Sequence, residues 1–293
     1  MSRVQERTAE AGTDGNVHVL LPVHNRMEIT RTCLAQLKRQ TLRPVQLVVI
    51  DDGSSDGTAA MVRAEAPEAT VIRGDGSLWW AGALQKGLDL LVRQGVARHD
   101  VVLILNNDTT FDDRFLELAM RALSGSASTM LLAQAYSSRT GKLIEVGVRV
   151  DWKVFRFDPV AEIEQANCLS TRGLFIRLAD ALRSGGFRPR LLPHYLSDYE
   201  FTIRAHRKGL RIITDPAVKL VVNEDATGQR LSDKSSLCAY FRSVFTKRSV
   251  PNPFYWTSFL LMACPARYIP LNLYRVWNGF FVELQQALLA RWR

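Results

Sequence analysis

Three consecutive polar residues, Asn106, Asn107 and Asp108, end the apolar run 101–105 and could bind a divalent cation. Carboxylate and amide oxygens are the ligands that Mg²⁺ and Mn²⁺ prefer, and these ions often use only one or two protein carboxylates together with substrate phosphates. Asp108, helped by a neighbouring amide oxygen, would therefore suffice for a metal site. The alternative is that the three residues only cap the helix that follows them.

A second pair of carboxylates, Asp51 and Asp52, ends the apolar run 45–50. An acidic residue in this position can accept hydrogen bonds from the base or ribose of a nucleotide. The chain contains neither GxGxxG nor GxxxxGK[ST], so a dinucleotide-binding fold and a P-loop NTPase are both poorly supported. The sequence therefore favours a nucleotide that is held with the help of a metal ion.

A candidate general base lies further along the chain, where Asp198 and Glu200 stand at the start of a predicted helix. A carboxylate here could accept the proton of an attacking hydroxyl group while a metal ion supports a departing diphosphate. The helix N-terminus would help to keep that carboxylate ionised. Asp198 could instead be a plain N-cap, and Glu200 a capping or salt-bridging residue.

The elements that position these residues are predicted from hydrophobic patterning. Apolar runs predict strands, and helical spacing predicts the helices between them; the strands are at 17–23, 45–52, 69–75 and 100–105, and the helices at 26–41, 55–67, 81–96 and 113–123. This alternation is typical of a parallel sheet with helices on both faces. The polar strand ends should then lie together at one edge of the sheet, where ligands bind.

The alternation changes after residue 125. Strands or a hairpin through Thr140-Gly141 are expected within 129–152, a strand and then a helix within 168–186, and a helix followed by strands within 199–225. The chain shows no internal repeat and no low-complexity linker.

Four motifs, taken together, resemble those of family 2 glycosyltransferases. They are "PVHNR" at 22–26, "VVIDDGSSDGT" at 48–58, "LNND" at 105–108 and "LSDYEFTIRAHRKG" at 196–209. The family comprises inverting, nucleotide-sugar-dependent enzymes, including bacterial rhamnosyltransferase-like ones, and the resemblance covers about residues 17–225. It implies an α/β GT-A fold, with a mostly parallel sheet flanked by helices and, in this chain, a C-terminal amphipathic helical extension.

The resemblance also implies roles for individual residues. Asp198 would be the general base with Glu200 second, Asp108 the ligand of Mg²⁺ or Mn²⁺, and Asn223 an added ligand where many relatives have a histidine. The positions near the nucleotide or the sugar would be Pro22, His24, Asn25, Asp52, Gly76, Trp79, Trp80, Gly82, Asn107 and Arg172. Open alternatives are that one of the two tryptophans fills the core, that Arg172 is a salt-bridged surface residue, and that His194 merely lines the pocket or faces solvent.

Composition and charge describe the rest of the chain. The 293 residues carry a net charge of +9, and the four cysteines form no CxxC pair, which fits a reducing cytoplasm. Residues 1–16 are polar without an apolar segment and predict a flexible leader rather than a secretory signal. A glycosyltransferase domain is expected at 17–230, with a nucleotide-binding half at 17–125 and an acceptor-binding half at 126–230.

The segment 231–293 has eight Lys and Arg against two acidic residues, interleaved with aromatic residues. Amphipathic helices of this composition lie well at an anionic membrane surface. They could equally pack on the core or on another subunit, since an oligomer is compatible with the sequence. The basic residues are separated by apolar ones and no recognition motif appears, so nucleic acid is not an expected partner.

These observations predict an inverting glycosyltransferase that moves a sugar from a nucleotide-sugar to a hydroxyl group of a glycan or lipid-linked acceptor. By resemblance, the context would be bacterial surface polysaccharide or lipopolysaccharide synthesis, with a deoxysugar such as rhamnose as donor. The enzyme would be cytoplasmic, or peripheral on the inner face of the membrane. The alternatives are a non-catalytic nucleotide-sugar or glycan-binding module and a nucleotidyltransferase, although the latter should have a Gly-rich basic loop after the first strand.

Overall fold

The computed structural model describes residues 15–224, 237–247 and 249–289. Most of the predicted leader 1–16, and the predicted boundary near residue 230, therefore lie outside the described residues. Gly15 and Asn16 are described, and the backbone N–H of Asn16 donates to Asp100 Oδ1 at 3.0 Å.

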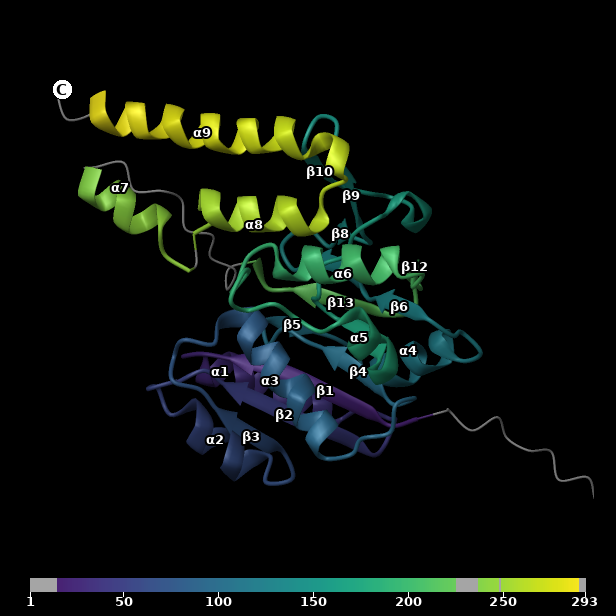
Figure 1. The fold of residues 1–293 in the computed structure, drawn as a ribbon. Coiled ribbons are helices and arrows are strands. Elements are labelled where there is room, and N and C mark those ends of the chain that lie inside the picture. The colour runs from purple at the N-terminus through teal and green to yellow at the C-terminus, as the bar shows by residue number, and fades with distance from the viewer. Residues whose placement is uncertain (1–14, 225–236, 248, 290–293) are drawn as a thin grey trace, which may run out of the picture.

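A seven-stranded sheet forms the centre of the molecule, in the order β12-β6-β11-β4-β1-β2-β3 (Figure 1). Its strands are β1 (Val17–Val23), β2 (Val45–Asp51), β3 (Thr70–Arg73), β4 (Val101–Ile104), β6 (Thr129–Leu132), β11 (Leu174–Arg177) and β12 (Arg211–Ile213). All pairs are parallel except those of β11, which is antiparallel to both neighbours. The predicted mostly parallel sheet is confirmed, and β1, β2, β3 and β4 end at the same edge.

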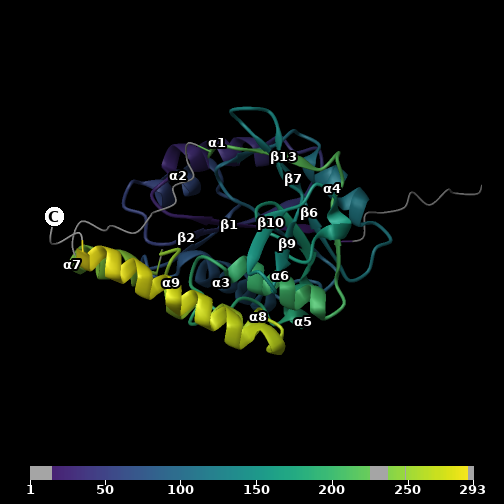
Figure 2. The ribbon, with the colours of Figure 1, turned by 90° about the horizontal axis from the view of Figure 1, so that it is seen from above.

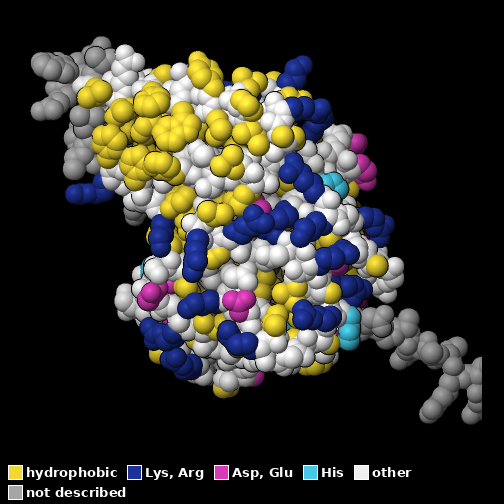
Figure 3. Space-filling view, viewed as in Figure 1, with side chains coloured by type: hydrophobic (Ala, Val, Ile, Leu, Met, Phe, Trp, Pro, Cys, Tyr) yellow, Lys and Arg dark blue, Asp and Glu magenta, His cyan; other side chains and the backbone are white. Residues whose placement is uncertain are grey.

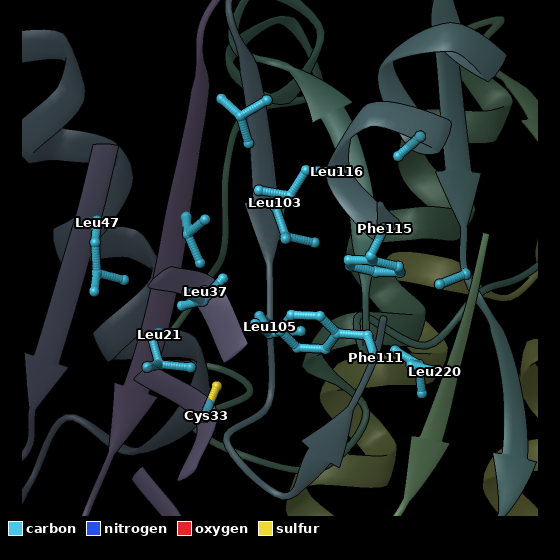
Figure 4. Packing of buried hydrophobic residues seen from close by; sticks show 14 of the residues in the cluster. Leu21, Cys33, Leu37, Leu47, Leu103, Leu105, Phe111, Phe115, Leu116 and Leu220 are labelled. Atoms are coloured by element: carbon cyan, nitrogen blue, oxygen red, sulfur yellow. The ribbon is translucent and has the colours of Figure 1, made fainter. Parts of the chain in front are cut away.

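Helices cover both faces of this sheet because its buried strands carry apolar residues on both sides. In β1, Val19 and Leu21 pack towards one face and Leu20 towards the other. One face is covered by α1 (Met27–Lys38), α2 (Thr58–Glu65) and α4 (Phe115–Leu123), and the other by α3 (Trp79–Arg93), α5 (Leu178–Ser184) and α6 (Ser197–Arg207). Figure 2 shows α1 and α3 on opposite sides of the strands. Figure 4 shows part of the first layer, in which Leu21, Leu103 and Phe115 lie together.

The run 129–137 looks continuous in the sequence, but the structure divides it at Ala133 between two sheets. β6 stays in the large sheet, and β7 (Gln134–Ser137) joins a four-stranded sheet with β5 (Thr109–Thr110), β8 (Leu143–Glu145) and β13 (Lys219–Val222). At this point Gly173 packs so closely that an added Cβ would lie 2.6 Å from Leu220 Cδ2. Because it has no side chain, Gly173 leaves room for Leu220 of β13 and for Ala133 at the point where the two sheets meet. The hairpin through Thr140-Gly141 joins β7 and β8 as predicted.

Three helices follow the domain: α7 (Leu237–Val244), α8 (Pro253–Ala263) and α9 (Ile269–Leu289). They lie on the side of the molecule that carries α6 (Figures 1 and 2). The predicted helical extension is therefore confirmed, but α8 is apolar on all sides rather than amphipathic. Part of this apolar surface is buried, because α8 lies between α6 and α9 and packs with a β-ribbon of β9 (Val148–Asp151) and β10 (Arg156–Pro159), while Phe254 and Leu261 stay exposed. None of the described helices has the length and apolar character needed to cross a membrane.

Candidate active site

A cleft of about 390 Å³ opens where β1, β2 and β4 end, beside the N-terminus of α6. This is the edge at which the sequence placed the polar strand ends. Ten of the predicted site residues line it: Pro22, His24, Asp52, Gly76, Trp79, Trp80, Asn107, Asp108, Arg172 and Asp198. Four others, Asn25, Gly82, Glu200 and Asn223, do not.

Asp52 lines the cleft, but its carboxylate binds the protein backbone. Oδ1 accepts hydrogen bonds from the N–H groups of Gly76 at 2.9 Å and Leu78 at 3.1 Å, and Oδ2 accepts one from Trp79 at 2.8 Å. Asp52 thus caps the N-terminus of α3 and holds the loop that precedes it. It shapes the cleft through this loop, whatever further contact it makes with a ligand.

His24 and Asn25 connect the loops that follow β1 and β2. His24 Nδ1 lies 2.6 Å from the carbonyl oxygen of Asp52 and so donates to it. Asn25 is exposed and adopts a positive φ of 50°, and its Oδ1 accepts from the N–H of Ser55 at 2.8 Å. Asn25 therefore joins two loops outside the cleft, whereas His24 forms part of the wall.

The two adjacent tryptophans both face the cleft, with different partners. Trp79 has a positive φ of 56° and packs edge to face against the ring of His194, with centroids 5.7 Å apart. Trp80 donates from Nε1 to Thr171 Oγ1 at 3.1 Å and also packs against the core beneath α3. Trp80 therefore fills part of the core and also lines the cleft. Gly82 lies about one helical turn after Leu78 in α3, and the side chains of Leu78 and Pro189 lie around it.

The segment after β4 offers oxygen atoms to a cation. In the described part of the chain, Asn106 Oδ1 and Asp108 Oδ1 are buried oxygens without a hydrogen-bond partner, and both residues line the cleft. Asn107 is held differently, because its Nδ2 donates to Thr30 Oγ1 at 2.9 Å. Buried oxygens that lack donors are costly unless something positive approaches them. This donor set suits a hard cation.

The metal ligands would be few. No group of three or more His, Cys, Asp or Glu side chains fit to hold a metal occurs among the described residues. Asn223 lies next to the site through its backbone N–H, which donates to the carbonyl oxygen of Asp108 at 2.9 Å, while its side chain is exposed and outside the cleft lining. A metal here would depend on Asp108, an amide oxygen and ligand phosphates.

Asp198 stands in the first turn of α6 and lines the same cleft. Its Oδ1 accepts from the N–H of Tyr199 at 3.0 Å. The pKa of Asp198 is raised to about 6, chiefly by burial and also by the negative charge of Glu145, against the lowering effects of the N–H of Tyr199 and the charge of Arg172. A carboxyl group with a pKa near 6 is a good proton acceptor at neutral pH and is ionised there.

Glu200 has a structural role instead. It is buried and accepts two hydrogen bonds from Arg204, from Nε to Oε1 and from Nη2 to Oε2, each at 2.7 Å. Arg204 in turn donates to the carbonyl oxygens of Ser184 and Gly186. The pair therefore ties α6 to the end of α5, and these contacts match the salt-bridging alternative.

The sequence analysis missed two charged residues at this site. Arg26 lines the cleft and its Nη1 lies 3.2 Å from Asp108 Oδ2; it belongs to the "PVHNR" motif, which was the available signal. Glu145 on β8 is half-buried and does not line the cleft itself, but it accepts from Oγ of Ser170, which does, at 3.1 Å, and burial raises its pKa. A lone Glu in a short strand gives no sequence signal, since its position depends on the tertiary fold.

Comparisons with known proteins agree with this architecture. The sequence matches the model of the family described as "Glycosyl transferase family 2" over residues 18–181. Among solved structures, a mannosyltransferase from Pyrobaculum calidifontis in complex with GDP-Man and Mn²⁺ is 16% identical with a TM-score of 0.55, and the match covers 94% of this chain and 86% of that one. S. aureus TarS residues 1–349 in complex with UDP-GlcNAc is 17% identical with a TM-score of 0.59, covering 91% and 73%. No curated protein matches the sequence.

Proposed function

The chain belongs to glycosyl transferase family 2 and has the GT-A fold of nucleotide-sugar-dependent glycosyltransferases, and from this premise we propose that it transfers a hexosyl group, with inversion, to a hydroxyl group of a glycan or lipid-linked acceptor. One observation carries the proposal: a single cleft contains the Asp108 carboxylate at the end of β4 and the Asp198 carboxylate at the start of α6. The first suits the diphosphate of a donor, and the second suits the removal of a proton from an acceptor.

In this mechanism each residue has a separate task. Asp198 accepts the proton of the acceptor hydroxyl group as its oxygen attacks the anomeric carbon, and the bond from that carbon to the diphosphate breaks. Asn107 and Arg172 face the sugar or its phosphates, and Trp79 offers an aromatic face to the base or sugar. Asp52 holds the loop at Gly76 in place, so the walls that contact the nucleotide are set before binding.

We propose that Asp108 and the side-chain oxygen of Asn106 are the protein ligands of Mg²⁺ or Mn²⁺. Asn223, whose backbone N–H donates to the carbonyl oxygen of Asp108, is a further candidate ligand. The two buried oxygens without partners support this choice. A bound divalent cation would stabilise negative charge on the departing diphosphate. The Mn²⁺ in the structure of the Pyrobaculum mannosyltransferase supports a divalent metal for this chain too.

The C-terminal helices support a membrane-linked acceptor. An aromatic face, defined as Phe241, Phe245, Phe254, Trp277, Phe280 and Phe281, runs across α7, α8 and α9 with ring centroids 5.5–5.9 Å apart between neighbours. Figure 3 shows apolar side chains gathered over these helices, with Lys and Arg below them. We infer peripheral binding to an anionic membrane surface, and an acceptor in bacterial surface polysaccharide synthesis; rhamnose is our choice of donor sugar.

The decisive experiment measures release of nucleoside diphosphate from a panel of UDP-, GDP- and dTDP-sugars with Mg²⁺ or Mn²⁺. Wild type should consume one donor. Asp198→Asn should lower turnover by about 10²–10⁴-fold, the usual contribution of a general base, with donor affinity changed less than about three-fold. Asp108→Ala should abolish the metal dependence of donor binding.

Asp180→Asn is the matched control, because Asp180 also lies in the first turn of a helix, α5, and has a raised pKa, but is outside the cleft. It should keep full turnover. Full activity of Asp198→Asn would exclude this residue as the base. Donor binding by wild type without any turnover would favour the non-catalytic sugar-nucleotide-binding alternative.

A further inference from the structure

Arg26 is the positively charged residue in contact with the carboxylate of Asp108. It precedes the first turn of α1, and its Nη1 lies 3.2 Å from Asp108 Oδ2. The two partners differ in exposure, since the side chain of Asp108 is 5% exposed and that of Arg26 is 29% exposed. The guanidinium therefore reaches from the open cleft onto a buried carboxylate.

This pairing has an electrostatic consequence for cation binding. A buried carboxylate without a counter-charge is unfavourable, and Arg26 supplies that charge in the nucleotide-free protein. A divalent cation bound at Asp108 Oδ1, the oxygen without a hydrogen-bond partner among the described residues, would stand close to the guanidinium. The two positive groups repel each other, so Arg26 opposes metal binding in the absence of further negative charge.

A diphosphate would reverse this balance. Guanidinium groups have five N–H donors in a fixed planar arrangement and bind phosphate in a bidentate manner. Arg26 lines the same cleft as Asn107, Asp108 and Arg172, where the proposed function places the phosphates. The negative charges of a diphosphate attract both the guanidinium and the metal, and remove the cause of their repulsion.

We propose that Arg26 is the second cationic group of the diphosphate site: it holds Asp108 in the nucleotide-free protein, opposes metal binding there, and binds the diphosphate once donor and metal arrive together. The inference rests on the proposed function and adds to it a coupling between the two ligands. Because such coupling is reciprocal, the nucleotide tightens metal binding by the same factor as the metal tightens nucleotide binding.

The test is equilibrium binding, without catalysis. Mn²⁺ affinity is measured by calorimetry and electron paramagnetic resonance, with and without UDP, GDP or dTDP, for wild type, Arg26→Gln and Arg26→Lys. Arg26→Gln should bind Mn²⁺ about ten-fold more tightly without nucleotide, and the diphosphate about ten-fold more weakly at saturating Mn²⁺, a size within the usual range of coupling between sites. The factor by which the nucleotide and Mn²⁺ tighten each other's binding should therefore be smaller in Arg26→Gln than in wild type.

Arg26→Lys keeps the charge but loses bidentate binding. Its Mn²⁺ affinity should stay within about two-fold of wild type, and its diphosphate affinity should fall, which keeps the proposal testable if Arg26→Gln does not fold. Arg31→Gln is the matched control on the same helix: its Nε pairs with Glu65 at 2.6 Å, it is outside the cleft, and both affinities should be unchanged.

Two results would overturn the inference alone. One is Mn²⁺ affinity of Arg26→Gln equal to or below that of wild type, which would mean that Arg26 only orients Asp108. The other is wild-type Mn²⁺ affinity that is the same with and without nucleotide. A wild-type protein that binds neither Mn²⁺ nor any of the three nucleotides would overturn the proposed function as well, so the two failures are distinguishable.

Discussion

Asp198 illustrates how one residue acquires its chemistry from several elements. The carboxyl group comes from α6, and the charged groups that change its pKa are Glu145 on β8 and Arg172 in the loop before β11. Burial provides the largest effect, and the net result of all these effects is a pKa of about 6. The group is therefore a stronger base than an exposed aspartate and is still ionised at neutral pH.

This pKa predicts the pH dependence of turnover. A general base must be deprotonated, so the rate at low donor concentration should rise between pH 5 and 7 with an apparent pKa near 6. Replacing Glu145 by Gln removes a negative charge that raises this pKa, so the rise should move to lower pH. A pH–rate profile for both proteins is the measurement, and coincident profiles would contradict the assigned role of Glu145.

The same pKa predicts a cost in stability. A carboxyl group whose pKa is raised from 3.8 to about 6 favours folding below pH 3.8, and this contribution is lost as the pH rises through 6. Asp198→Asn should therefore raise the free energy of unfolding at pH 7.5, by at most about 3 kcal/mol at ~1.4 kcal/mol per pKa unit. Urea unfolding at pH 7.5 and pH 4 measures it. The gain should be nearly absent at pH 4, and equal gains at both values would refute the explanation.

At the scale of elements, the loops after β2 and β3 form one unit. Gly53 has a positive φ of 72°, and an added Cβ would lie 2.6 Å from the backbone nitrogen of Gly76. The carboxylate of Asp52 binds three N–H groups across the same junction. The position of Trp79 in the cleft therefore depends on Asp52.

Asp52→Ala should thus lower both stability and donor affinity. Three backbone donors lose their acceptor, which should cost about 2–3 kcal/mol, and a loosened loop should raise the Kd of the donor at unchanged metal affinity. Thermal unfolding and donor titration measure the two effects. Asp75→Ala is the control: its Oδ1 accepts from Ser77, in an exposed turn, and a change below about 1 kcal/mol is expected. Similar losses in both variants would argue against a special role for Asp52.

The strands and helices of the first half could be predicted from the sequence because their signals are local. The apolar run that ends at Asn106 and the helix spacing around Cys33 depend only on neighbouring residues, and the structure has both elements where expected. The division at Ala133 could not be predicted, because β6 pairs with β11 and β12 while β7 pairs with β13, and all three of these strands are distant in sequence.

The candidate site shows the same difference between local sequence signals and contacts that depend on the tertiary fold. The cleft contains most of the motif residues because strand ends converge at one edge of a parallel sheet. The hydrogen bonds that engage Asp52, Glu200 and Asn25 involve partners from other loops or side chains whose placement the sequence does not report. Residue type and spacing therefore predicted which residues gather at one cleft, and less often what each side chain contacts.

At the scale of the whole molecule, the aromatic face is notable because several of its side chains are exposed. Phe254 is 55% exposed and Phe281 is 57% exposed, although aromatic side chains of this size are usually buried. Three aromatic-to-serine changes, at Phe241, Phe254 and Phe281, should reduce flotation with liposomes that contain anionic lipid by at least about ten-fold, since each ring contributes buried apolar area.

Val92, Leu143 and Val154 provide the control, because they are comparably exposed apolar residues outside the C-terminal helices. Changing them to serine should leave flotation unchanged. Equal flotation of the aromatic triple variant and wild type would remove the membrane assignment, and a change of oligomeric state in size-exclusion chromatography would instead assign this face to a second copy of the chain.

The strand β4 joins the two halves of the sheet, since it pairs with β1 on one side and with the antiparallel β11 on the other. If the gene were split near residue 125, the first product would have β4 (Val101–Ile104) as an unpaired, apolar edge strand, which would tend to pair with another copy. Neither piece should stay soluble when it is expressed alone. When the two pieces are co-expressed, they should reassemble through the pairing of β4 with β11. The chain would then serve as a split-protein reporter.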